Sequence, residues 1–149
     1  MQIDDPVIRP VRESEFAQWL PLWQGYQAFY RARLGDDVTR TTWQRFFDER
    51  EPIHCLVAER DGQLIGLAHY LFHRSTWLAS DACYLNDLFV DPSGRRSGVA
   101  RKLIEAVYEA ADKAGAPKVY WLTHESNAAA RLLYDQVARH GGFIQYERP

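Results

Sequence analysis

A strand-like run, a glycine-containing turn and an amphipathic helix follow one another over residues 82–115 and constrain the fold most strongly. Residues 82–90 are mostly apolar, and the sequence DPSG after them is a turn signal. From Gly98 to residue 114, apolar side chains recur at spacings of three and four, and Gly115 with Pro117 supplies a helix stop. The pattern predicts a strand, a tight turn and a helix over residues 98–114.

Four cations crowd the expected N-terminal end of this helix: Arg95, Arg96, Arg101 and Lys102. The helix dipole makes that end partially positive, so each cation there is unfavourable by roughly 0.3–1 kcal/mol. A bound anion reverses the sign, because the dipole, the unpaired amides and the guanidinium groups all attract it. Gly98 lets an anion approach the backbone closely. We therefore expect a phosphate-bearing ligand at this helix start, the alternative being a solvated basic helix face.

Residue periodicity predicts further strands and helices on both sides of this segment. Helical spacing of apolar residues covers residues 16–30, 39–48 and 127–139, with Pro21 starting or kinking the first helix. Strand-like runs cover residues 7–11, 54–60, 64–73, 118–123 and 142–146, and Asp61-Gly62 is a hairpin signal. This order predicts an α/β fold in which a mixed sheet has helices on both faces.

The bulk composition is that of one globular domain over residues 1–149, with 46% apolar and 26% charged residues. A formal net charge of −2 gives no bias toward nucleic acid or an anionic membrane, and no apolar run approaches the ~18 residues that span a bilayer. Cys55 and Cys83 lack metal-type spacing, so we expect buried free thiols and a cytoplasmic protein. His69 and His73 would lie about 13 Å apart along a strand, so we expect no metal site.

Two common phosphate-binding motifs are absent from the segment that follows residue 90. A Walker A loop needs Gly-Lys-Ser/Thr at the helix start, and Gly98-Val99 does not supply it. A dinucleotide fingerprint needs three glycines in the pattern GxGxxG, which Gly94 and Gly98 do not form. ATP and NAD are therefore poor candidates for the ligand.

The stretch RRSGVA at residues 95–100 matches a Q/R-x-x-G-x-G/A signature, and on it the chain resembles the GNAT superfamily of N-acetyltransferases. LNDLFVDP is similar to the fourth strand of that family, VAERDGQLIG to its second and third strands, and ESNAAARLLYDQVARHGGF to its Asn-to-Tyr helix and the strand beyond. The resemblance covers residues 7–147 in order and is closest to the branch that acetylates polyamines, lysine-like amines and histone tails. It implies a mixed, mostly antiparallel sheet of six to seven strands with about four helices on both faces.

The resemblance also implies acetyl-CoA as the cofactor. Its pantetheine arm is expected along the backbone of Leu88, Phe89 and Val90, where a β-bulge of the family splays the strand from its neighbour and an amide stabilises the thioester oxygen. Asn127 is expected to contact the cofactor, its alternative role being the helix N-cap, and Ala130 leaves space for the ligand. The diphosphate is expected on the amides of Arg95, Arg96, Ser97, Gly98, Val99, Ala100 and Arg101.

Two residues are candidates for the proton transfers of an amine acetylation. Tyr134 matches the general acid of the family, which protonates the coenzyme A thiolate, and its alternative role is a core aromatic. Only about 0.04% of an amine with a pKa of about 10.4 is neutral at pH 7, so the site must remove a proton. Asp87 is a charged residue in an otherwise apolar strand, which favours a function in attracting the amine and accepting that proton.

The acceptor is expected to be a small amine or a peptide, contacted by Asn86, Trp23, Tyr26 and His124. The polyamine-type pattern has two acidic residues where this chain has Asn86-Asp87, and the loss of one carboxylate favours a monoamine, an amino acid or a peptide N-terminus.

The C-terminus leaves room for one final strand where the family has two, so we expect a homodimer that covers the open edge. Two other functions remain as alternatives: a non-catalytic acyl-CoA-binding module, and a nucleic-acid binder, which the net charge disfavours.

Overall fold

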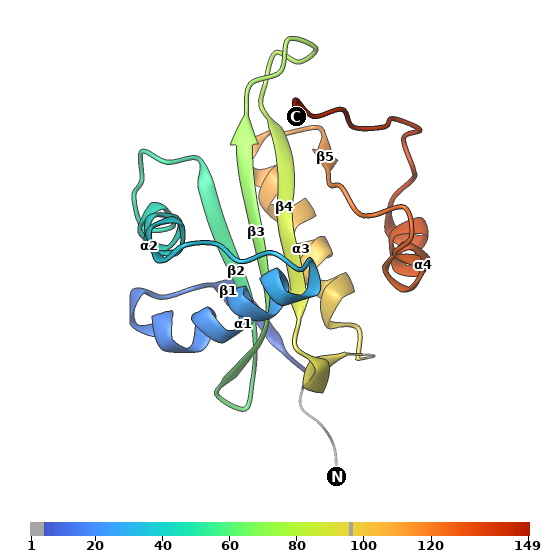
Figure 1. The fold of residues 1–149 in the computed structure, drawn as a ribbon. Helices are drawn as coiled ribbons and strands as arrows, with labels where there is room; N and C mark the ends of the chain where they lie inside the picture. Colours follow the sequence, from blue (N-terminus) through green and yellow to red (C-terminus); the bar gives the residue numbers. More distant parts are fainter. Residues whose placement is uncertain (1–4, 96) are drawn as a thin grey trace.

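The computed structural model describes residues 5–95 and 97–149, and in them a curved sheet separates two layers of helices (Figure 1). Helices α1 and α2 lie on one face of the sheet, α3 lies on the other, and α4 lies beyond β5. The elements in chain order are β1 (Val7–Pro10), α1 (Phe16–Phe29), α2 (Asp36–Arg45), β2 (Ile53–Arg60), β3 (Gln63–His73), β4 (Ala82–Val90), α3 (Val99–Ala114), β5 (Val119–Tyr120) and α4 (Ala128–Val137). Short 3₁₀ turns, η1 (Glu13–Glu15) and η2 (Pro92–Gly94), precede α1 and follow β4.

The strands are ordered β1-β2-β3-β4-β5, with antiparallel pairing up to β4 and parallel pairing between β4 and β5. The predicted hairpin is confirmed, because Asp61 (φ 52°) and Gly62 (φ 77°) both take positive φ, as a tight primed turn requires. A mixed sheet with helices on both faces is thus the architecture that the periodicity predicted.

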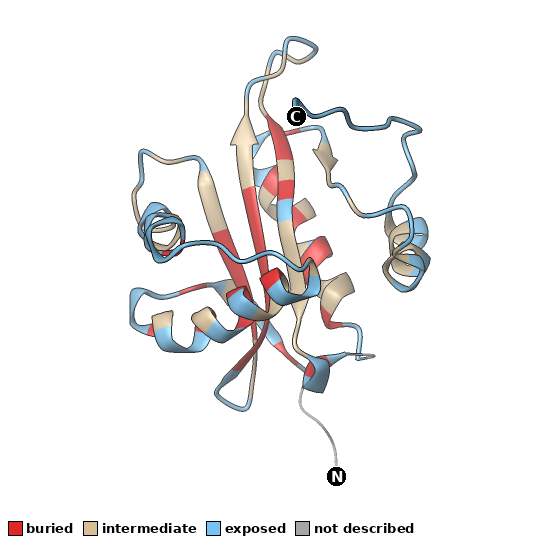
Figure 2. Cartoon of the chain, in the orientation of Figure 1, coloured by how far each residue is buried: buried red, intermediate tan, exposed pale blue. Residues whose placement is uncertain are grey.

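Each face of the sheet carries its own apolar core. The core on the α3 side is aliphatic and includes Leu85, Leu103 and Val107, all at most 2% exposed. The core on the α1 side is aromatic and centres on Trp19 and Trp23. Figure 2 shows that buried residues gather in the central strands and on the sheet-facing sides of α1 and α3, whereas α4 has no buried residue.

An irregularity in β4 changes which face its side chains occupy. Tyr70 pairs with Leu85 and His69 pairs with Asp87, so Asn86 is an extra residue without a partner on β3. Leu85 and Leu88 therefore both pack against the α3-side core although three positions separate them. Strict alternation cannot do this, so β4 contains a bulge, which lies at Asn86 rather than at Leu88–Val90, where the family resemblance predicted it.

The C-terminal part of the chain differs from the prediction. The described residues form five strands rather than six or seven, and residues 142–146 are not a strand. β5 pairs with β4 only through Val119 and Tyr120, so it offers an edge too short to hold another strand. The side chains of Phe143, Ile144 and Tyr146 are 78–88% exposed as a result.

Pro21 lies inside α1 rather than at its start. It is on the exposed side of the helix, as is Ala17, whose carbonyl would have accepted the missing hydrogen bond, so the helix continues through the proline. Cys55 and Cys83 are buried free thiols, as predicted. Within the described residues, no helix is both long enough and apolar enough to cross a membrane.

Candidate active site

The N-terminus of α3 presents unpaired backbone amides. Gly98 is the N-cap residue with a φ of +78°, and a Cβ built on it would meet nothing within 4 Å. Lys102 N donates the first hydrogen bond of the helix to Gly98 O at 3.1 Å, so the amides of Val99, Ala100 and Arg101 have no acceptor within the helix. The amides and the open space at Gly98 together fit an anionic group such as a diphosphate.

The cations around this helix start are engaged elsewhere. Arg95 donates from Nε to Val90 O at 3.1 Å and lies over the ring of Phe89, while Arg101 donates to Gln136 Oε1 on α4. Lys102 forms an ion pair with Asp5 at 3.4 Å. Arg96 lies outside the described residues. The side chains of Arg95, Arg101 and Lys102 therefore have partners within the protein, whereas the first backbone amides of α3 have none within the helix.

The Ser97 hydroxyl closes the turn before α3. It donates to Gly94 O at 2.7 Å and accepts from Arg60 Nη2 at 3.3 Å. These two bonds hold the chain in place just before the open glycine.

A narrow groove forms where β4 and β5 separate. The two strands pair only at Cys83–Val119 and Tyr84–Tyr120, after which β4 runs on to Val90 without a partner on this side among the described residues. Free strand backbone of this kind can pair with an extended amide-containing arm, which suits pantetheine. The innermost space is about 10 Å³, room for about one water. Its lining residues are Tyr26, Tyr30, Leu85, Asn86, Leu88, Trp121, Leu122 and Tyr134.

Tyr134 reaches this groove from α4. Its ring packs edge-on against Trp121, with the ring centroids 5.4 Å apart. Burial raises the pKa of Tyr134 to about 12, and the neighbouring Tyr30 adds to the effect. The phenol is therefore neutral at physiological pH and has a proton to donate.

Asp87 lies on the α1 side of β4, behind the groove lining. Its Oδ2 accepts from Nδ1 of His69 at 2.8 Å, and its Oδ1 lies 3.3 Å from Nδ2 of Asn86. The Asp87 side chain is 12% exposed. Burial, the charge of Asp87 and a hydrogen bond to it raise the pKa of the Tyr26 hydroxyl, which also lies 3.5 Å from Asn86 O.

The sequence-predicted residues fall into two groups. Tyr26, Asn86, Leu88 and Tyr134 meet at the groove. Trp23 does not line it, because its ring is 5% exposed, stacks on Trp19 and Tyr26, and donates from Nε1 to Thr39 at 3.2 Å.

The remaining predicted residues surround the groove at a distance. His124 is exposed and lies beside Tyr30, with the ring centroids 5.6 Å apart. Asn127 is the N-cap of α4 and donates from Nδ2 to Thr123 Oγ1 at 3.2 Å, rather than capping the helix with its side chain. Ala130 is half-buried on α4, and the Phe89 ring packs on the α1 side, so Phe89 can serve the groove only through its backbone.

Several contributors, among them Leu85, Trp121, Leu122 and His69, were not predicted from the sequence. Trp121 and Leu85 line the groove from strand-like runs that look like ordinary core. His69 is 1% exposed and contacts Asp87, and the available signal was a lone ionisable residue in the apolar run IGLAHYLF. Its partner depends on the strand register, which the bulge at Asn86 shifts.

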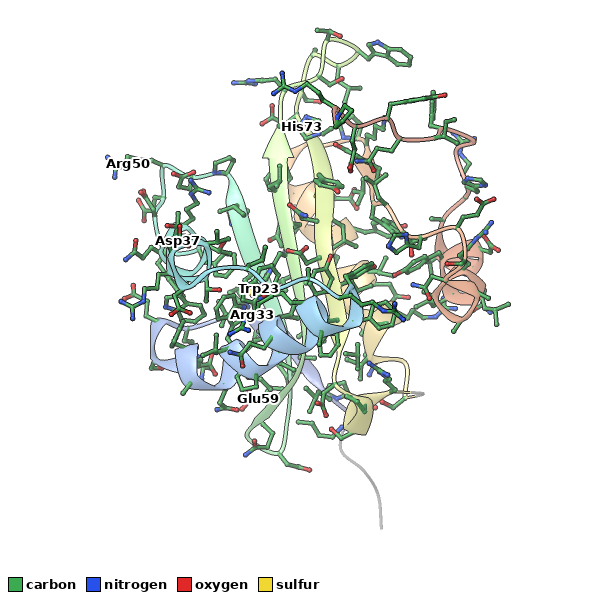
Figure 3. All side chains as sticks on the ribbon, viewed as in Figure 1. Trp23, Arg33, Asp37, Arg50, Glu59 and His73 are labelled. Carbon is green, nitrogen blue, oxygen red and sulfur yellow. The ribbon has the colours of Figure 1, made fainter. Side chains whose placement is uncertain are left out.

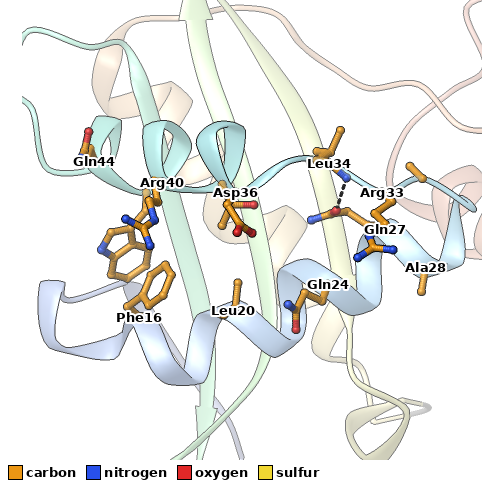
Figure 4. Close-up of a pocket in the computed structure, with 13 residues that line it drawn as sticks. Phe16, Leu20, Gln24, Gln27, Ala28, Arg33, Leu34, Asp36, Arg40 and Gln44 are labelled. Atoms are coloured by element: carbon orange, nitrogen blue, oxygen red, sulfur yellow. Dashed lines mark hydrogen bonds between the residues drawn. The ribbon is translucent and has the colours of Figure 1, made fainter.

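A larger cavity of about 660 Å³ lies between α1 and α2, away from this groove (Figure 4). Leu20, Gln24 and Ala28 on the outer side of α1 line it, together with Arg33 and Arg40. Neither Asp87 nor Tyr134 lines this cavity. No cluster of three or more possible metal ligands occurs within residues 5–95 and 97–149.

The profile of the acetyltransferase (GNAT) family matches residues 17–138, in agreement with the fold, the groove and the free amides of α3. The chain belongs to this family and is an acetyl-CoA-dependent N-acetyltransferase. It is 38% identical over 147 residues to the D-amino-acid N-acetyltransferase HPA3 of Saccharomyces cerevisiae, which covers 97% of this chain and 91% of that protein. It is 27% identical to the thialysine N-epsilon-acetyltransferase of Mus musculus, over 85% of this chain and 79% of that one.

Solved structures agree on the fold. An aminoglycoside N-acetyltransferase, AAC(6')-Iy in complex with CoA, superposes with a TM-score of 0.85 at 20% identity, covering 100% of this chain and 97% of that one. A ribosomal-protein-alanine N-acetyltransferase from Brucella melitensis gives a TM-score of 0.80 at 18% identity, covering 98% and 99%. The family resemblance predicted from RRSGVA, and the cofactor it implies, are confirmed.

Proposed function

We propose that the chain transfers acetyl directly to the primary amine of a small acceptor that presents one ammonium group to the site, with an amino acid as the favoured class. The observation that carries this proposal is the single carboxylate Asp87 on β4, next to the neutral amide of Asn86. One carboxylate is enough to attract one ammonium group, whereas a polyamine, which carries several, is attracted more strongly by two carboxylates. The names of two relatives, a D-amino-acid and a thialysine acetyltransferase, support amino acid acceptors.

We infer that the cofactor is held mainly by backbone. The amides of Val99, Ala100 and Arg101 would hold the diphosphate, and the unpaired edge of β4 along Leu88 and Phe89 would hold the pantetheine arm. When bound, acetyl-CoA supplies the acetyl group in activated form, as a thioester. Side chains at Gly98 would intrude on this site, and the open space there supports the assignment.

Asp87 attracts the ammonium form of the acceptor and accepts its proton at Oδ1, directly or through a water. The loss of that proton is needed because the protonated amine has no lone pair with which to attack. Tyr26 and Asn86 border the same place and would orient the amine. His124 lies on the outer side, beside Tyr30, where it would contact the rest of the acceptor.

Tyr134 donates the proton that the leaving sulfur needs. Its neutral phenol faces the groove from α4, and the edge-on contact with Trp121 restricts the ring. A thiol pKa of about 8.5 lies below that of the phenol, so the proton is shared in the transition state rather than fully given up.

The test is the release of free thiol from acetyl-CoA across a panel of amines: D- and L-amino acids, lysine, spermidine and a short peptide. We expect the highest kcat/KM with an amino acid and a lower value with spermidine. Preference for spermidine would contradict the acceptor class. Thermal stabilisation by coenzyme A with no acceptor in a broad panel would favour the non-catalytic acyl-CoA-binding module instead.

We also propose a homodimer in the cytoplasm. The exposed apolar side chains of Phe143, Ile144 and Tyr146 and the short edge strand β5 support a second copy covering this region. The buried free thiols of Cys55 and Cys83 suit a reducing compartment. Light scattering should give twice the chain mass, and the double change of Phe143 and Ile144 to serine should give monomers. A wild-type monomer at micromolar concentration would refute the dimer.

A further inference from the structure

His69 is a buried polar residue in the middle of an apolar strand. It is 1% exposed, and the rings of Trp19, Trp23 and Phe46 surround it with centroids 4.9–5.9 Å away. An imidazole in such surroundings is costly unless both of its nitrogens are hydrogen-bonded. Both are bonded here, which makes the identity of each partner informative.

The partners of His69 fix its protonation pattern. Nε1 of Trp19 lies 3.0 Å from Nε2 of His69, and an indole nitrogen can only donate, so Nε2 is the acceptor. Nδ1 then carries the proton and donates it to Oδ2 of Asp87 at 2.8 Å. A second proton on His69 would place two N–H groups face to face at Trp19. The contact with Asp87 is therefore a hydrogen bond from a neutral imidazole rather than an ion pair.

We propose that His69, fixed as the neutral Nδ1–H form by Trp19, is the positioning residue that orients Asp87 toward the acceptor amine. This inference rests on the proposed function of Asp87. With Oδ2 occupied by His69, the amine would bind at Oδ1, which also accepts a long hydrogen bond from Nδ2 of Asn86 at 3.3 Å. His69 cannot relay the proton of the amine, because Nδ1 is already protonated and Trp19 blocks Nε2. The proton must leave Asp87 on the solvent side.

The other ionisable groups that sense the charge of Asp87 are neutral. Tyr26 and Tyr30 on α1, Tyr84 on β4 and Cys55 on β2 all have pKa values raised by burial and, further, by that charge. The carboxylate is therefore surrounded by neutral groups, of which His69 and Asn86 hydrogen-bond to it. A cationic amine is the group that would balance its charge.

Two variants of His69 separate its role in positioning Asp87 from its role in packing the core. His69→Leu removes the donor to Asp87, whereas His69→Asn keeps an amide donor close to the place of Nδ1. The loss of one hydrogen bond to a charged group lowers an equilibrium constant for binding about tenfold or more. We therefore expect His69→Leu to raise the KM for the amine about tenfold. His69→Asn should recover part of that loss. The KM for acetyl-CoA and the thermal shift given by coenzyme A should not change in either variant.

A second pair of variants tests the role of Trp19. Trp19→Phe keeps an aromatic ring but removes the N–H that bonds to His69. Trp43→Phe is the same substitution at a ring that packs on Trp19 and does not bond to His69. Nitrogen-15 NMR of the wild type should show a protonated Nδ1 and an unprotonated Nε2 for His69, assigned by its loss in His69→Asn. Trp19→Phe should change that pattern and raise the KM for the amine, and Trp43→Phe should do neither.

The outcomes distinguish this inference from the proposed function. An Nε2–H form or an imidazolium in the wild type at neutral pH would overturn the inference even if the enzyme is active. Equal KM values for the amine in His69→Leu, His69→Asn and the wild type would do the same. If no amine is acetylated, the proposed function fails, and the NMR pattern still decides the state of His69.

Discussion

Tyr134 lines the groove from α4, whereas Asp87 lies behind the groove lining, on the α1 side of β4. Both were found in the sequence, Asp87 because a charge in an apolar strand is costly and Tyr134 because it matches a family motif. His69 was not found, because its contact with Asp87 follows from a strand register that the extra residue Asn86 shifts. A contact across two strands is set by pairing, which the local sequence of neither strand contains.

Removing the Tyr134 hydroxyl should slow turnover without loss of cofactor binding. In Tyr134→Phe the ring still packs on Trp121, but no proton is available to the leaving sulfur, and general-acid catalysis typically contributes 10²–10⁴-fold. We expect kcat to fall more than about tenfold, measured by thiol release, with an unchanged Kd for coenzyme A by calorimetry. Full activity in Tyr134→Phe would remove this residue from the mechanism.

Neutralising Asp87 should move activity to higher pH. In Asp87→Asn the acceptor amine must lose its proton in solution, so the rate should rise with pH toward the ordinary amine pKa of about 10.4. The measurement is kcat/KM for the best amine between pH 6 and 10 in both proteins. Asn86→Asp, which adds a second carboxylate at the site, serves as the comparison and should improve spermidine relative to amino acids. An unchanged profile in Asp87→Asn would discard the role of Asp87 as base.

Among the secondary-structure elements, those with a strong period were predicted well. The hairpin of β2 and β3, the strand β4 and the helix α3 lie within one or two residues of their expected bounds. The second helix begins at Asp36 rather than at Thr39, because its first turn is polar and carries no apolar period. The prediction of a last strand was wrong. Residues 142–146 have the composition of a strand, but β5 is too short to pair with another strand.

The junction of β1, η1 and β2 depends on a half-buried ion network. Arg9 donates to both oxygens of Glu15 at 2.6 and 2.8 Å and to Glu59 at 2.9 Å. The hydrogen bond from Arg9 holds the pKa of Glu15 below its usual range. A lowered pKa in the folded state stabilises the fold above the unfolded pKa of about 4.3, and this contribution is lost as the pH falls through the folded value.

Glu15→Gln should therefore destabilise the protein at neutral pH by about 1.5–3 kcal/mol, the range for a hydrogen bond to a charged group. Urea unfolding at pH 7 and at pH 3 gives the measurement, and the difference from the wild type should shrink at pH 3. Asp48→Asn is the control, because Asp48 pairs with Arg50 at the exposed periphery, where Arg50 points away from the fold (Figure 3). It should leave the free energy of unfolding unchanged. A pH-independent difference for Glu15→Gln would contradict the electrostatic origin.

In the molecule as a whole, the two faces of the sheet support different parts of the proposed site. The aliphatic core beneath α3 supports the helix start expected to hold the cofactor, and the aromatic core beneath α1 supports Asp87 through Trp19 and His69. Composition and periodicity predicted that helices lie on both faces. They could not predict that one face is aromatic at the site, because which side chains face one another is decided by packing.

The whole fold should lose stability in alkali. Burial raises the pKa of Tyr70 to about 12 and that of Tyr134 likewise, against about 10 in an unfolded chain. A raised phenol pKa gives stability that is fully present below pH 10 and is lost as the pH rises toward 12. The slope should approach about 1.4 kcal/mol per pH unit for each such phenol.

Urea unfolding at pH 9, 10 and 11 measures this loss. Tyr70→Phe should reduce the pH dependence of the unfolding free energy by nearly the contribution of one proton. Tyr70 is 7% exposed in the wild type, and the variant lacks its phenol. The variant should be compared with the wild type by slope rather than by absolute stability. An identical slope in the two proteins would show that Tyr70 ionises alike in the folded and unfolded states.

The unpaired Asn86 changes which residues of β4 face α3. Before Asn86 the odd-numbered residues face α3, and after it the even-numbered residues do. A substitution at this position is a local event that can retune the acceptor. A deletion of the same codon would remove the bulge and make the alternation of β4 regular, with Leu85 on the α3 side and Asp87 still opposite His69 on the α1 side. Point mutation at codon 86 can therefore change the acceptor, while a deletion there would straighten β4 and leave the faces of Asp87 and Leu88 unchanged.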